Sequence, residues 1–141
     1  GPQDAYDNIE RTEAFLSEAK SKNVKVDRYH GDFTEASGYR IGKSIINTND
    51  FPPAVFCAND QMALGFIRAM KEYHLRAPHD IAVVGFDDIA LAEYNELTTI
   101  GVSRKEWGAL AAKQLIDLIE NEIPFKSYKI RVKLIERASS R

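Results

Sequence analysis

The stretch that decides the fold is AVFCANDQMALG, residues 54–65. Its first part, Ala54 to Ala58, is a short and continuous apolar run, typical of a β-strand buried on both faces. Asn59 and Asp60 come next, and either side chain could cap a following helix. Apolar residues then recur at helical spacing as far as Met70. The stretch therefore predicts a strand followed directly by a helix.

The same alternation continues toward the C-terminus. Residues 81–86 form a second apolar run, which Asp87-Asp88 follows. Residues 98–102 form a third, β-branched stretch, which Ser103-Arg104 follows. Apolar residues at helical spacing then predict a long helix over about 105–120.

Toward the N-terminus the pattern is similar. Residues 9–19 place their apolar side chains on one helical face, with Asp7 as a candidate cap. Residues 24–29 alternate like a half-buried strand. A possible capping box at Asp32 begins a helix that runs to about Asn47.

Strands that alternate with helices predict an α/β fold, a doubly wound and mainly parallel sheet with helices on both faces. Ligands of such sheets bind beyond the carboxyl ends of the strands. The polar residues that follow the three strands should therefore lie close together. They are Asn59, Asp60, Asp87, Asp88, Ser103 and Arg104.

Composition narrows the class of protein. The 141 residues suit one globular domain, with 44% hydrophobic and 28% charged residues. The net charge of −2 does not favour nucleic acid as a direct partner. Neither a signal peptide nor a membrane-length apolar run is present, so no membrane association is expected. The single cysteine, Cys57, has apolar neighbours, and we expect a buried, inert thiol.

The polar residues at the strand ends suit a polyhydroxylated ligand. A carboxylate accepts hydrogen bonds from adjacent hydroxyls, and an arginine donates a planar fork. Phe33 or Phe86 could cover the apolar face of a sugar. Simple structural roles compete with this interpretation, because Asn59 and Asp87 could cap helices and Phe86 could belong to the core.

The sequence supports an enzyme less well than a ligand-binding domain. Asp87-Asp88 could act as an acid–base pair, and a catalytic domain stays an alternative on that ground. The three histidines lack the spacing of metal ligands, so no metal is expected. No nucleophile elbow or phosphate-binding glycine loop occurs, and we expect neither an enzyme nor a cofactor.

The sequence resembles the LacI/GalR family of bacterial transcriptional repressors. The resemblance rests on AVFCANDQMALG at 54–65 and on DIAVVGFDDI at 80–89, which LTTI follows at 97–100. The remaining matches, in order and spacing, are Gly1-Pro2, Arg11, GDFT at 31–34, Gly108 and Glu136-Arg137.

The resemblance implies a periplasmic-binding-protein-like core of two subdomains with the effector between them. It assigns residues 1–103 to the C-terminal effector-binding subdomain, and residues 104–124 to a crossover helix that packs on the N-terminal subdomain. Residues 125–141 form a closing strand and tail. Since Gly1-Pro2 matches the loop after the subdomain's first strand, we expect a fragment that lacks this strand, the N-terminal subdomain and a helix-turn-helix headpiece.

The resemblance also implies a set of effector-binding residues. They are Arg11, Phe33, Asn59 and Asp87, whereas Asp60 is expected to cap a helix and Asp88 to be structural. Arg104 departs from the family, because some sugar-responsive members have an aromatic residue there. A desolvated guanidinium at position 104 prefers an anion, such as a phosphorylated effector, although it could also turn toward solvent.

The function implied is that of a cytoplasmic, homodimeric regulator. A small-molecule effector, a sugar, a sugar phosphate or a nucleobase, would bind in the cleft and change operator affinity. Operator DNA would be contacted only through the headpiece. The alternative is the sugar-binding protein of an ABC transporter, which shares the fold.

Overall fold

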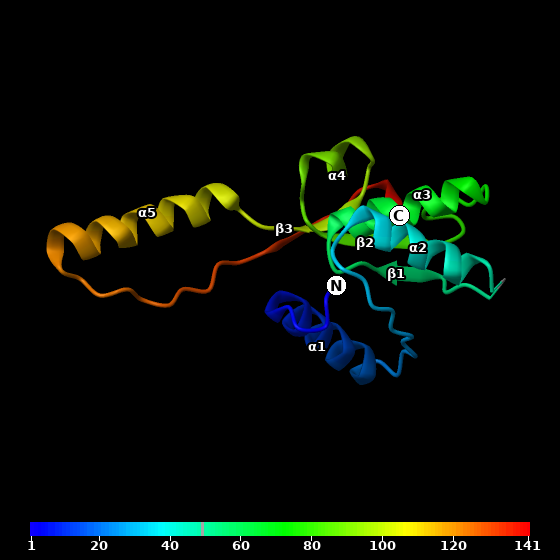
Figure 1. The fold of residues 1–141 in the computed structure, drawn as a ribbon, viewed down its shortest axis with the longest axis horizontal. Helices are drawn as coiled ribbons and strands as arrows, with labels where there is room; N and C mark the ends of the chain where they lie inside the picture. The colour runs from blue at the N-terminus through cyan, green and yellow to red at the C-terminus, as the bar shows by residue number, and fades with distance from the viewer. Residues whose placement is uncertain (49) are drawn as a thin grey trace.

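The computed structural model describes residues 1–48 and 50–141, with helices and strands in alternation from α2 to β4. Figure 1 shows their arrangement. In chain order they are α1 (Tyr6–Ser21), α2 (Glu35–Ile46), β1 (Ala54–Phe56), α3 (Asp60–Glu72), β2 (Ala82–Asp87), α4 (Ala90–Tyr94), β3 (Thr98–Gly101), α5 (Arg104–Asn121), β4 (Lys133–Ile135) and the short 3-10 helix η1 (Ala138–Ser140).

The strands form one sheet in the order β1-β2-β3-β4. β1 pairs with β2, and β2 with β3, both in parallel, whereas β4 runs antiparallel to β3. The parallel register aligns Phe56 with Val84 and Asp87 with Gly101. The carboxyl ends of the first three strands therefore meet at one edge, and the prediction of a mainly parallel α/β sheet is confirmed.

The two faces of the sheet are covered unequally. Along β2, Val83 and Gly85 are buried on the side of α3, since successive strand side chains alternate between faces. Phe86 points to the other face and is only half-buried. There α1 stacks Phe15 on Phe56, with ring centroids 5.1 Å apart. Helices thus contact both faces, as expected of a doubly wound sheet.

The core lies between the sheet and the pair α2–α3. Phe66 and Met70 of α3 are almost fully buried in it. The two helices approach closely at glycines, because a side chain on Gly65 would collide with the carbonyl oxygen of Glu35. A side chain on Gly38 would likewise collide with the backbone of Met62. Small residues at the crossing allow this pair to pack backbone against backbone.

The predicted strand at residues 24–29 is wrong. The segment has no strand structure and is largely exposed. It lies across a groove of about 530 Å³, which separates it from β1. Without a neighbouring strand its backbone has no ladder partner, and alternation alone does not make a strand. β1 is correspondingly less buried than predicted, since Ala54 is exposed.

Two predicted helix caps are also wrong. No side chain caps α1, and Asp7 lies in its first turn instead. α2 is capped by Thr34, whose hydroxyl oxygen accepts a hydrogen bond from the Ser37 amide. Asp32 instead holds the capping residue, because its carboxylate accepts hydrogen bonds from the amide and hydroxyl of Thr34. The capping group is thus shifted by two residues.

The predicted long helix is confirmed as α5, and it projects away from the rest of the molecule (Figure 1). None of its residues is buried, and Trp107 is 52% exposed. The chain returns without regular structure and adds β4 to the sheet at 133–135, within the segment 125–141 in which a closing strand was predicted. No helix in the described residues is both long and apolar enough to cross a membrane.

Candidate functional site

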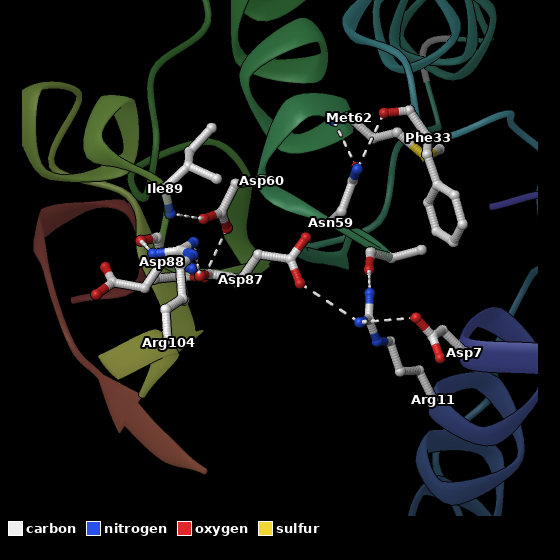
Figure 2. Close-up of polar contacts among 12 residues, drawn as sticks. Asp7, Arg11, Phe33, Asn59, Asp60, Met62, Asp87, Asp88, Ile89 and Arg104 are labelled. Atoms are coloured by element: carbon white, nitrogen blue, oxygen red, sulfur yellow. Dashed lines mark hydrogen bonds and ion pairs between the residues drawn. The ribbon is translucent and has the colours of Figure 1, made fainter. Parts of the chain in front are cut away.

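The polar residues that follow the strands gather at one edge of the sheet (Figure 2). Asn59 and Asp60 follow β1 and begin α3, while Asp87 ends β2. Arg104 begins α5, just after β3. Arg11 reaches the same edge from α1, on the other side of Asp87 (Figure 2). The convergence predicted from the strand order is therefore present.

Arg11 is held by three kinds of contact. Its Nη1 donates a hydrogen bond of 2.8 Å to the carbonyl oxygen of Ala58. Its Nη2 lies 3.4 Å from Asp87 Oδ1 and 3.9 Å from an oxygen of Asp7. The guanidinium carbon lies 3.9 Å from the centre of the Phe86 ring. These contacts fix the guanidinium but leave donors free for a ligand.

Asp87 is the carboxylate that is best placed to accept hydrogen bonds from a ligand. Its side chain is 34% exposed, and its contact with Arg11 is long. Burial raises the pKa of Asp87 above its ordinary value, while the nearby Arg11 and Arg104 lower it. Burial has the larger effect, so the site leaves this carboxylate incompletely compensated. A ligand that donates hydrogen bonds to it would supply the missing stabilisation.

Asn59 already serves the fold with both ends of its amide. Its Oδ1 accepts from the Met62 amide at 2.9 Å and caps α3, and its Nδ2 donates to the Phe33 carbonyl at 3.0 Å. Phe33 has a left-handed backbone, with φ of 67°. Asn59 thus fixes the loop that carries Phe33 (Figure 2). Direct contacts of Asn59 and Phe33 with an effector stay predictions.

Asp60 is not the helix cap that we expected. Asn59 takes that role, and the Asp60 carboxylate accepts from the Thr99 hydroxyl and the Ile89 amide instead. Asp88 has a structural contact, as expected, since its Oδ1 lies 2.9 Å from Nη2 of Arg137. Asp87 and Asp88 were candidate caps for the helix that follows them, but neither caps α4, which has no side-chain cap.

Arg104 binds the backbone of the loop after β2. Its Nη1 donates to the Asp88 carbonyl at 3.0 Å, and its Nη2 donates to the Asp87 carbonyl at 2.5 Å. This places its positive charge beside the candidate site, with two of its donors in use. Whether it also meets an anionic effector stays a prediction.

Neither a reactive cysteine nor a metal site lies among the described residues. Cys57 is buried, and burial raises the pKa of its thiol to about 12, which makes it unreactive as expected. Within residues 1–48 and 50–141, no group of histidine, cysteine, aspartate or glutamate residues could hold a metal ion.

Residues 1–140 match the periplasmic binding protein-like domain family. The chain belongs to this family. Among the curated relatives of this periplasmic binding protein-like domain is the HTH-type transcriptional repressor PurR of Photorhabdus laumondii. The two are 37% identical over 135 residues, which is 92% of this chain and 40% of that protein. The chain thus spans about two fifths of the length of the curated relatives it matches.

Solved structures agree with this assignment. The lac repressor dimer bound to operator and the anti-inducer ONPF has a TM-score of 0.89 and 29% identity, covering 99% of this chain and 50% of that one. A LacI family transcriptional regulator from Enterococcus faecium with bound ribose has a TM-score of 0.88 and 27% identity, covering 99% and 54%. The resemblance to effector-binding domains of LacI/GalR regulators is confirmed.

Three groups of this periplasmic binding protein-like domain form hydrogen bonds with the candidate site residues but were not predicted from the sequence. They are the Ala58 carbonyl, the Thr99 hydroxyl and the Arg137 guanidinium. Arg137 lies 49 residues from Asp88, so no local pattern relates them. The LTTI motif did contain Thr99, but nothing in its spacing predicted a bond to Asp60.

Proposed function

We propose that this domain senses a small polyhydroxylated molecule, a sugar or sugar derivative, and thereby controls a LacI-type transcriptional repressor. The observation that carries the proposal is the Arg11–Asp87 pair at the carboxyl ends of the strands. It presents free guanidinium donors beside an incompletely compensated carboxylate, flanked by Phe86. The ribose-bound Enterococcus regulator and the repressor relatives support the same class of function.

The chemistry follows from the two side chains. Adjacent sugar hydroxyls donate to the two oxygens of Asp87, and Arg11 donates to hydroxyl or ring oxygens. An aromatic ring at Phe33 covers the apolar face of the sugar. The affinity then depends on the ionised form of Asp87, because only the carboxylate accepts at both oxygens.

Regulation is proposed to work by population shift. The effector binds one arrangement of the two subdomains more tightly, and this changes the affinity of a distant DNA-binding headpiece for its operator. The whole protein is proposed to be a cytoplasmic homodimer. Repressor relatives favour this reading over the sugar-binding protein of a transporter and over an enzyme.

A thermal-shift screen with D-ribose, ribose 5-phosphate and adenine tests the proposal. A ligand that binds the native state raises the melting temperature by mass action. We expect a shift with a sugar that Arg11→Ala and Asp87→Asn both abolish, whereas Arg131→Ala, a change at an exposed site, leaves it intact. A shift that survives both site variants, or none with any sugar, contradicts the proposal.

Arg104 distinguishes a phosphorylated effector from a neutral one. Its guanidinium lies beside the site, at the backbone of Asp87 and Asp88. If the effector is phosphorylated, we expect Arg104→Gln to weaken ribose 5-phosphate binding and to leave the response to D-ribose nearly unchanged. Equal losses for both ligands would show that Arg104 only holds the loop.

A further inference from the structure

Asp60 has a buried carboxylate that does not cap its own helix, α3. Its side chain has no exposed surface, although Asn59 already caps α3. A buried carboxylate is costly unless it is hydrogen-bonded. The contacts that Asp60 makes therefore need a reason outside its own helix.

Those contacts join three parts of the molecule. One Asp60 oxygen accepts from the Thr99 hydroxyl of β3 at 2.6 Å, and the other accepts from the Ile89 amide at 2.9 Å. The Thr99 oxygen in turn accepts from the Asp88 amide at 3.3 Å. Two consecutive amides of the loop after β2 are thus bound, directly or through Thr99, by one carboxylate.

Gly85 provides the space for this carboxylate. A side chain there would collide with Asp60 Oδ1. Gly85 is on β2, two residues before Asp87. The glycine in β2 therefore leaves room for the Asp60 carboxylate to lie against the strand that ends at Asp87.

The loop that Asp60 binds has an unfavourable backbone. Asp87 has φ of 106° and Asp88 has φ of 49°, and both lie in the left-handed region. Positive φ is uncommon for non-glycine residues, although less so for aspartate, and an unfavourable backbone persists where the surrounding structure holds it. The hydrogen bonds to the next two amides are contacts that can impose this geometry (Figure 2).

We propose that Asp60 is a positioning residue for effector recognition: through Thr99 and the Ile89 amide it sets the loop that presents Asp87 to the ligand. It does not touch the ligand, because it is fully buried. This rests on the proposed function, since Asp87 is the group whose placement matters.

The neighbouring threonines Thr98 and Thr99 supply a matched pair of variants. Both are buried in β3, but the Thr98 hydroxyl bonds to the C-terminal tail and not to Asp60. Thr99→Val and Thr98→Val make the same chemical change without altering charge. Asp60→Asn is the direct variant, and Thr99→Ser restores the hydroxyl. All are made in the full-length regulator, because the proposed effector cleft is formed by both subdomains.

The first readout needs no ligand. We expect Thr99→Val and Asp60→Asn to speed hydrogen exchange at the Asp88 and Ile89 amides about tenfold, compared with Thr98→Val. NMR titration of the Asp87 carboxyl should give a changed midpoint in Thr99→Val and the wild-type midpoint in Thr98→Val and Thr99→Ser. Unchanged exchange and titration in Thr99→Val would overturn the proposal, even if its stability falls.

The second readout uses D-ribose. We expect Thr99→Val to raise its dissociation constant about tenfold, the equivalent of one lost hydrogen bond. Thr98→Val should bind as the wild type does. If wild-type protein does not bind D-ribose, the ribose form of the proposed function fails, while exchange and titration still decide the role of Asp60. Equal binding by both valine variants overturns the positioning role.

Discussion

Helices α3 and α5 are both amphipathic, yet seven residues of α3 are buried and none of α5 is. Spacing of apolar residues shows which side of a helix is suited to burial, but not what covers it. The apolar face of α3 packs against α2 and the sheet, whereas Trp107 and Ile119 of α5 are exposed. The two helices therefore contribute unequally to the buried core.

The local support of the two helices differs much less. Asn59 caps α3, and Ser103 accepts a longer hydrogen bond of 3.4 Å from the Glu106 amide in α5. Lys113 and Asp117 of α5 also form an ion pair one turn apart. Such contacts contribute little compared with packing of an apolar face. The difference between the helices lies almost entirely in their tertiary contacts.

The largest expected effect is on core packing. Phe66→Ala removes a ring that is 2% exposed and should lower the free energy of unfolding by about 3–5 kcal/mol. Ile119→Ala, at a side chain that is 70% exposed, should change it by less than about 0.5 kcal/mol. Urea denaturation measures both. Similar losses would mean that α5 is packed against another surface in solution.

A pair of glycines gives an intermediate effect with opposite signs. Gly65→Ala places a methyl group against the Glu35 backbone and should destabilise by about 1–3 kcal/mol. Gly108→Ala in α5 meets no atom within 4 Å and should stabilise by about 0.5–1 kcal/mol, because alanine favours the helix. Thermal melts of the two variants compare them. A destabilising Gly108→Ala would contradict the open surroundings of α5.

The smallest effect concerns the start of α2. Hydrogen bonds from Thr34 and Ser37 lower the pKa of Asp32 from 3.8 to about 2. Ionised Asp32 therefore stabilises the folded state above pH 3.8, and this contribution is lost as the pH falls through about 2. We expect Asp32→Asn to be less stable than the wild type at pH 6 and equal to it below pH 2. Denaturation across this range measures the difference, with Asp4→Asn as the control.

Much of the fold could be predicted because its signals are local. Strands β1 to β3 and helices α2, α3 and α5 appear as apolar runs or helical periodicities. Residues 24–29 show the limit, since a strand needs a partner that alternation does not reveal. The caps at Thr34 and Asn59 show a second limit. Several polar residues near the start of a helix carry an oxygen that could cap it, and the backbone geometry decides which of them does.

The candidate site could be predicted in part for the same reason. Parallel strands bring their ends together, so Asp87 and Arg104 could be grouped without a structure. The partner of each group could not be predicted. Arg11 contacts Ala58 across 47 residues, and Asp60 contacts Thr99 across 39. Such pairs depend on how the elements pack, which one sequence does not specify residue by residue.

The attachment of α5 has a mechanical consequence. The chain leaves the sheet at Arg104 and rejoins it at β4, and the guanidinium groups of Arg104 and of Arg137, just beyond β4, both bind Asp88. Both ends of the projecting arm are thus bound close to Asp88. A force that moves the arm reaches Asp88 from two directions, and Asp87 is the next residue along the backbone.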